Sequence, residues 1–125
     1  MHELSILQAI YLSLREIARR YGARRVLRFR LEVGELANVV PELLEEAFAV
    51  LKAAEPLIAD AVMEYSIVPL TLRCPECGYY GPWRERTVRC PECGSATVDV
   101  VDGEDLYLRD VELDIPEENY GQDNG

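Results

Sequence analysis

The sequence lacks several residue types and patterns, and each absence narrows the function. It has a single histidine, His2, and no glycine-rich phosphate loop. No nucleophile–base pair is therefore visible, and we expect no enzyme activity. No stretch of about 18 or more apolar residues occurs, so we expect no membrane partner. The first residues carry neither a basic region nor a small-residue cleavage site, which predicts a cytoplasmic protein without a signal peptide.

Positive charge is scarce relative to negative charge. The 125 residues have a formal net charge of −10. Phosphate binding needs concentrated positive charge, so the sequence argues against a nucleic-acid partner. An arginine cluster between residues 15 and 30 reads as a solvated helix face followed by an exposed strand face, with a docking surface for an acidic protein as the alternative. Its members are Arg15, Arg19, Arg20, Arg24, Arg25, Arg28 and Arg30.

The apolar pattern of the first half alternates between helix and strand. Residues 4–21 repeat apolar side chains at helical spacing, which predicts an amphipathic helix that Gly22 ends. Residues 25–33 alternate with a period of two, which predicts a strand with one buried face. The side chains expected on that face are Leu27, Phe29, Leu31 and Val33.

One more helix and two more strands follow in the pattern. Pro41 suits the first position of a second helix, which ends at Glu55. Residues 61–68 predict a strand. Residues 105–113 predict another strand, whose alternation slips after Leu108, so that a bulge is needed to restore the register.

All four cysteines lie in two copies of one short motif, which we call the knuckles: Cys74-Pro75-Glu76-Cys77-Gly78 and Cys90-Pro91-Glu92-Cys93-Gly94. Each knuckle places two sulfurs on one tight turn, and its glycine permits the bend. The segment between the knuckles is long enough for a hairpin that returns the second beside the first. Four thiolates around one ion are typical of structural zinc.

Other interpretations of the cysteines fit less well. Disulfides are disfavoured in a cytosolic chain, and a redox motif explains only one pair. Rubredoxin-type iron usually has a longer gap between knuckles, and catalytic zinc needs an open coordination position. Nucleic-acid binding by this module is disfavoured, because acidic residues balance its arginines. We expect the aromatic side chains to pack the module, with a partner-facing role as the alternative: Tyr79, Tyr80 and Trp83.

The order of elements predicts the fold class. Two helices packed on a small three-stranded sheet, with an inserted zinc-ribbon module, make an α+β protein. We expect residues 1–68 and 100–113 to form the α/β domain and residues 69–99 to form the module. Residues 114–125 are expected to be an acidic disordered tail.

The amino terminus carries the second candidate metal site. The Met1 amine, the His2 amide nitrogen and the His2 imidazole can close fused chelate rings on one ion, and the Glu3 amide or carboxylate can complete a plane. Such square-planar nitrogen coordination suits Ni(II) or Cu(II). Binding releases protons, so the affinity should fall in acid. The alternative is a solvated His2, with Glu3 complementing the helix dipole.

The whole pattern resembles the HypA/HybF family of hydrogenase and urease nickel-incorporation proteins. The matching motifs run in order over residues 1–113, but Glu104-Asp105 stands where the family often has a basic residue followed by glutamate. The motifs are Met1-His2-Glu3, Val33-Gly34-Glu35-Leu36, Glu46-Ala47-Phe48, Val68-Pro69, Cys90-Pro91-Glu92-Cys93-Gly94-Ser95 and Gly103-Glu104-Asp105-Leu106.

The resemblance implies a nickel metallochaperone that delivers Ni(II) to the large subunit of [NiFe]-hydrogenase. It implies a HypB-type GTPase as working partner and, in some organisms, urease maturation factors. His2 becomes the principal nickel ligand, assisted by Met1 and Glu3 through amine and amide groups. Zinc is then held by Cys74, Cys77, Cys90 and Cys93. The alternative function is a zinc-ribbon adaptor or interaction protein without nickel transfer.

Overall fold

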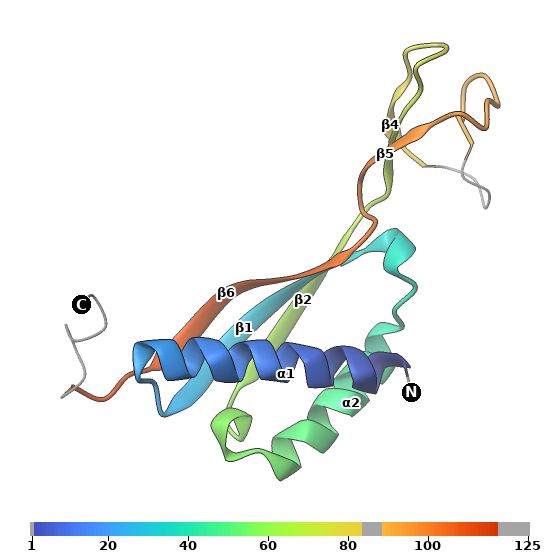
Figure 1. Ribbon diagram of the computed structural model, residues 1–125. Helices are drawn as coiled ribbons and strands as arrows, with labels where there is room; N and C mark the ends of the chain where they lie inside the picture. The colour runs from blue at the N-terminus through green and yellow to red at the C-terminus, as the bar shows by residue number, and fades with distance from the viewer. Residues whose placement is uncertain (1, 84–88, 118–125) are drawn as a thin grey trace. The chain divides into compact units, whose positions relative to one another are not determined.

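The computed structural model of this chain describes residues 2–83 and 89–117 (Figure 1). In these ranges two helices, two short 3-10 segments and six strands occur. The helices are α1 (His2–Tyr21) and α2 (Pro41–Ala54), and the 3-10 segments are Glu35–Ala37 and Pro56–Ile58. The strands are β1 (Arg25–Gly34), β2 (Val62–Val68), β3 (Thr71–Arg73), β4 (Tyr80–Pro82), β5 (Asp99–Asp102) and β6 (Leu106–Asp114).

The strands form two three-stranded sheets, ordered β2-β1-β6 and β4-β3-β5. The chain divides into two compact units. The first unit comprises Met1–Leu31, Val39–Tyr65 and Leu108–Gly125, and the second comprises Glu32–Asn38 and Ser66–Tyr107. The domain boundaries expected from the sequence, after residues 68 and 99, stay a prediction.

Both helices of the first unit form where the apolar pattern places them. Pro41 opens α2, and the backbone N–H of Glu55 donates to Leu51 at its end. Phe29 of β1 meets Phe48 of α2 edge to face, with ring centroids 5.5 Å apart. The buried side chains of α1 recur every three or four residues, so its apolar stripe is in the core: Leu7, Ile10, Leu14 and Ala18. Among the described residues, no helix combines the length and apolar content needed to cross a membrane.

The prediction for the first half of β1 is wrong at one residue. Leu27 is 39% exposed, whereas its neighbour Val26 is fully buried. Leu27 and Arg28 are both exposed, and the alternation resumes only at Phe29. A slip of one residue exchanges the two faces of a strand, so Val26 occupies the core position expected for Leu27.

Strand β6 confirms one expectation and corrects another. Asp110 has a φ of 51°, so the backbone leaves the extended conformation within the predicted break after Leu108. The disordered tail, however, does not begin at residue 114. Asp114 ends β6, and its carboxylate accepts hydrogen bonds from Arg24 at 3.0 Å and from Arg25 at 2.7 Å. The guanidinium groups of Arg24 and Arg25 both bind the Asp114 carboxylate and hold this residue against the first unit. Residues 118–125, the rest of the predicted tail, lie outside the described ranges.

Carboxylates of the first unit neutralise much of the arginine cluster. Besides the two arginines at Asp114, three others form ion pairs, which favours the solvated-face interpretation over an acidic docking partner. The pairs are Arg19 with Glu16, Arg28 with Glu64 and Arg30 with Asp110.

Asp114→Asn is expected to lower the free energy of unfolding slightly at neutral pH, because the ion pairs are partly exposed. The hydrogen bonds from Arg25 and then Arg24 lower the pKa of Asp114. This stabilisation is therefore present above the unfolded pKa of about 3.9 and disappears as the pH falls through the lower folded value. Urea denaturation at several pH values measures it. Glu112→Gln, at an exposed position of the same strand, is the control; an equal loss in both variants would contradict the assignment.

The second unit is built around β3. Leu72 pairs with Gly81 of β4 and Val100 of β5, and its side chain is fully buried. The packing role expected for the aromatic residues is wrong for Tyr80, which is 65% exposed. Tyr79 is half-buried and its hydroxyl donates to the Pro82 carbonyl at 2.7 Å. The small sheet leaves β4 uncovered at Tyr80, so this side chain has no core to enter.

Three family motifs meet at one junction within the second unit. Gly103 has a φ of 88°, and a Cβ there would lie 2.5 Å from the Pro69 carbonyl oxygen. A Cβ at Gly34 would lie 2.4 Å from the Gly103 oxygen. The Glu35 carboxylate accepts a hydrogen bond from the Leu70 N–H at 2.8 Å. The backbones approach too closely for any side chain at either glycine, which explains those two residues.

Candidate metal centres

The two knuckles fold into the same local structure. In the first, the Cys74 carbonyl accepts the Gly78 N–H at 2.9 Å, and the Cys74 N–H donates to Tyr79 at 2.8 Å. Gly78 has a φ of 83°, which favours glycine at this turn. The second knuckle repeats both hydrogen bonds and the left-handed glycine, through Cys90, Gly94 and Ser95.

The knuckles bring all four cysteine sulfurs together. Every pair lies within 4.8 Å; Cys74 and Cys93 are 3.7 Å apart, and Cys77 and Cys90 are 3.4 Å apart. Zn–S bonds of about 2.3 Å in a tetrahedron place the sulfurs about 3.8 Å from one another. The donor set and its spacing therefore fit one structural zinc ion.

The thiol pKa values of Cys90 and Cys77 shift in opposite directions. Burial raises the pKa of Cys90, but backbone N–H groups of Cys93 and Glu92 and the neighbouring thiols outweigh it, and the pKa falls to about 7. Although the Tyr79 backbone N–H opposes the change, hydrogen bonding to Cys90 together with burial raises the pKa of Cys77 to about 12. Binding a metal must displace protons from these thiols, so acid weakens it.

The side chains of the predicted nickel site that the structure describes, His2 and Glu3, lie at the start of α1. The imidazole of His2 is 58% exposed, and its Nδ1 atom is 3.8 Å from a Glu3 carboxylate oxygen. Amides in the first turn of a helix have no acceptor within that helix, so the His2 and Glu3 nitrogens are not committed to the helical ladder. Met1, the remaining predicted ligand, lies outside the described residues.

The Glu3 carboxylate has a structural contact that the sequence did not predict. Glu3 is only 5% exposed, and its carboxylate accepts a hydrogen bond from the Val40 N–H at 2.9 Å. This hydrogen bond lowers the pKa of Glu3 despite burial. The carboxylate links the start of α1 to the residue preceding α2. Of the two carboxylate oxygens, Oε2 accepts this hydrogen bond.

Comparison with known proteins identifies the family. Residues 1–113 match the model of HypA, described as a hydrogenase/urease nickel-incorporation metallochaperone. The chain belongs to the HypA family. It is 39% identical over 114 residues to the hydrogenase maturation factor HypA of Shewanella halifaxensis, covering 91% of this chain and 98% of that protein. Identity to HypA of Methanocella arvoryzae is 36% over 115 residues, covering 92% and 100%.

The solved structures show the same fold. The solution structure of the Ni metallochaperone HypA from Helicobacter pylori matches with a TM-score of 0.68 at 20% identity, covering 91% of this chain and 98% of that one. The predicted α+β class, with two helices, small sheets and a clustered four-cysteine site, is confirmed. Because the HypA family consists of metallochaperones, the expectation that the chain is not an enzyme is also confirmed.

Proposed function

We propose that this chain binds Ni(II) at its amino terminus and delivers it during maturation of [NiFe]-hydrogenase, while its four cysteines hold a structural zinc. The observation that carries the proposal is the family match, which begins at residue 1 and includes Met1-His2-Glu3. The exposed imidazole of His2 supports it, because a carrier must let its cargo enter and leave.

Nickel is the cargo, and its proposed ligands are Met1, His2 and Glu3. The Met1 amine, the His2 amide and imidazole nitrogens and the Glu3 amide nitrogen supply a planar nitrogen set. The Glu3 carboxylate holds the start of α1 against Val40, so it orients the donors instead of binding the ion. The site lies at one end of the chain and is open to solvent at His2, which allows exchange of ligands during transfer.

Zinc would be held by Cys74, Cys77, Cys90 and Cys93. When bound there, the ion supplies a cross-link between the two knuckles and no catalysis, because four sulfurs close its coordination shell. The knuckle hydrogen bonds fix the direction of each sulfur. Burial of Cys74 and Cys90 excludes water from one side of the cluster.

The proposed partners follow from the family. A HypB-type GTPase and the hydrogenase large subunit would exchange nickel with the chain in the cytoplasm, and urease maturation factors are further candidates. The family description covers both hydrogenase and urease. No nucleotide or catalytic group of this chain is needed for transfer, which is ligand exchange between two proteins.

The test is nickel loading in a hydrogenase-producing cell that lacks its own HypA-family protein. We expect this chain to restore nickel in the purified large subunit, measured by elemental analysis. The His2→Ala variant should restore little of it, whereas Glu112→Gln should restore as much as the unmodified chain. Equal loading with His2→Ala would contradict the proposal.

A further inference from the structure

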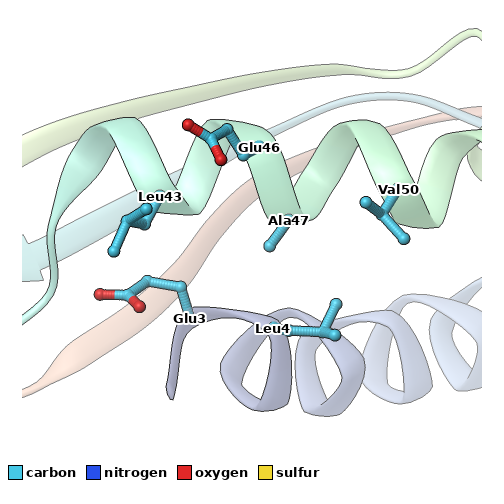
Figure 2. Close-up of a pocket in the computed structure, with 6 residues that line it drawn as sticks. All are labelled: Glu3, Leu4, Leu43, Glu46, Ala47 and Val50. Carbon is cyan, nitrogen blue, oxygen red and sulfur yellow. The ribbon is translucent and has the colours of Figure 1, made fainter. Parts of the chain in front are cut away.

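A groove between the two helices lies within the first unit beside the amino terminus. Its volume is about 150 Å³, similar to cavities that accept a benzene-sized group. Figure 2 shows Glu3 and Leu4 on the first turn of α1 and the other lining side chains on successive turns of α2, with Ala47 directed toward α1 and Glu46 on the side of α2 away from it in this view. They are Glu3, Leu4, Leu43, Glu46, Ala47 and Val50.

Helix α2 has apolar side chains outside the core as well as inside it. Leu44 and Phe48 are buried in the core. A second stripe follows at a spacing of four and three residues: Leu43 is 42% and Val50 is 60% exposed, and the small Ala47 between them is buried. Leu43 is next to the buried Leu44 in the sequence but lies outside the core. An exposed stripe with this spacing is typical of a helix-binding groove.

The charged side chains that line this groove are all acidic. Glu3 and Glu46 line it, and Glu42 is exposed one residue before Leu43. Lys52, the one base of α2, has its ammonium 5.4 Å from the centre of the Phe48 ring. On α1 the first arginine is Arg15, about 18 Å along the helix from Glu3. The groove is therefore apolar at its floor and acidic at its edge.

We infer that the protein which exchanges nickel with this chain docks in this groove, through a helix that presents one large aliphatic side chain flanked by lysines or arginines. The inference rests on the proposed function. An aliphatic anchor fills the apolar floor, and flanking cations match Glu42 and Glu46. The groove and the proposed nickel site are adjacent, because Glu3 lines the groove and directly follows the proposed nickel ligand His2.

Docking beside the amino terminus would bring the partner's ligands close to the bound Ni(II). A helix in the groove contacts Leu4 in the same turn of α1 that carries His2. The partner's own ligands are thereby held close to the cargo, which raises their effective concentration at the exchange step. Docking therefore promotes transfer without changing the affinity of the nickel site itself.

Two substitutions in the groove and two matched controls test the inference. Val50→Asp and Glu46→Lys alter the floor and the edge; Leu12→Asp and Glu112→Lys place the same changes at exposed positions elsewhere. In the nickel-loading assay we expect the groove variants to lose about tenfold or more in loading efficiency, and the controls to stay within about twofold. Calorimetry should show unchanged Ni(II) affinity in all four.

A peptide probe tests the chemistry of the occupant. The probe is a helical peptide of about 16 residues with one leucine flanked by arginines, compared with a version in which glutamates replace the arginines. We expect NMR shifts of the methyl groups of Leu4, Leu43 and Val50, and weaker binding of the acidic version by about tenfold or more. Undiminished loading by both groove variants overturns the inference, as does preference for the acidic peptide. Dissociation of a dimer by Val50→Asp would assign the groove to a second copy. Failure of the unmodified chain to bind or deliver nickel would instead reject the proposed function.

Discussion

Replacing Cys90 with serine is expected to remove zinc and unfold the cysteine module. Cys90 is buried, and its sulfur accepts N–H groups from Glu92 and Cys93 while lying 3.4 Å from Cys77. Apparent zinc binding in small domains supplies about 10–16 kcal/mol at pH 7, more than so small a core can replace. Zinc content should fall from one ion per chain to nearly none, by elemental analysis.

Hydrogen exchange locates the damage. Amides of β3 and β5 should lose protection by at least about 100-fold in Cys90→Ser, whereas amides in the middle of α1 should keep theirs. Ser95→Ala is the control, because it removes a hydroxyl that donates to Glu76 and leaves all four sulfurs. A Cys90→Ser protein with full zinc and unchanged protection would show that these sulfurs do not bind one ion. Zinc should also be lost to a chelator more readily in acid, since protons return to the thiols.

Replacing His2 with alanine is expected to weaken Ni(II) binding by roughly 100-fold or more. The imidazole is one donor of a planar set, and its loss opens a chelate ring. Calorimetric titration on untagged protein measures the change, and no other histidine in the sequence can substitute.

Glu3→Gln separates the two possible roles of Glu3. Glutamine retains an oxygen that can accept the Val40 N–H, so the start of α1 should stay in place. If the amide nitrogen is the donor, nickel affinity should remain within about threefold of the unmodified value. A loss as large as that of His2→Ala would assign the carboxylate to the metal. Nickel affinity should decrease with falling pH, because the donors must lose protons.

Local signals in the sequence were sufficient for the helices and the cysteine site. Pro41 and the apolar stripes specify the helices without reference to distant residues. The knuckles place sulfurs through turns whose glycines are recognisable in isolation, and their spacing implies one ion. The predicted helices and the clustering of the four cysteines are confirmed, because residues close in the chain determine each helix and each knuckle.

Features that depend on distant residues could not be predicted. Burial of Glu3 requires the N–H of Val40, 37 positions later. The side chain of Asp114 is held by Arg24 and Arg25, which lie 90 and 89 positions earlier. The exposure of Leu27 depends on which strand face the helices cover. The groove arises because α2 has two apolar stripes but only one finds a core, which periodicity alone cannot distinguish.

The most direct test acetylates the Met1 amine and repeats the nickel titration. The acetylated chain keeps the imidazole of His2 and every side chain of the fold, but its terminal nitrogen is an amide and no free amine remains beside His2. Coordination by the amino terminus predicts a loss of at least about 100-fold in Ni(II) affinity with unchanged zinc content. Equal affinity in the acetylated and unacetylated chains would contradict nickel binding at this terminus.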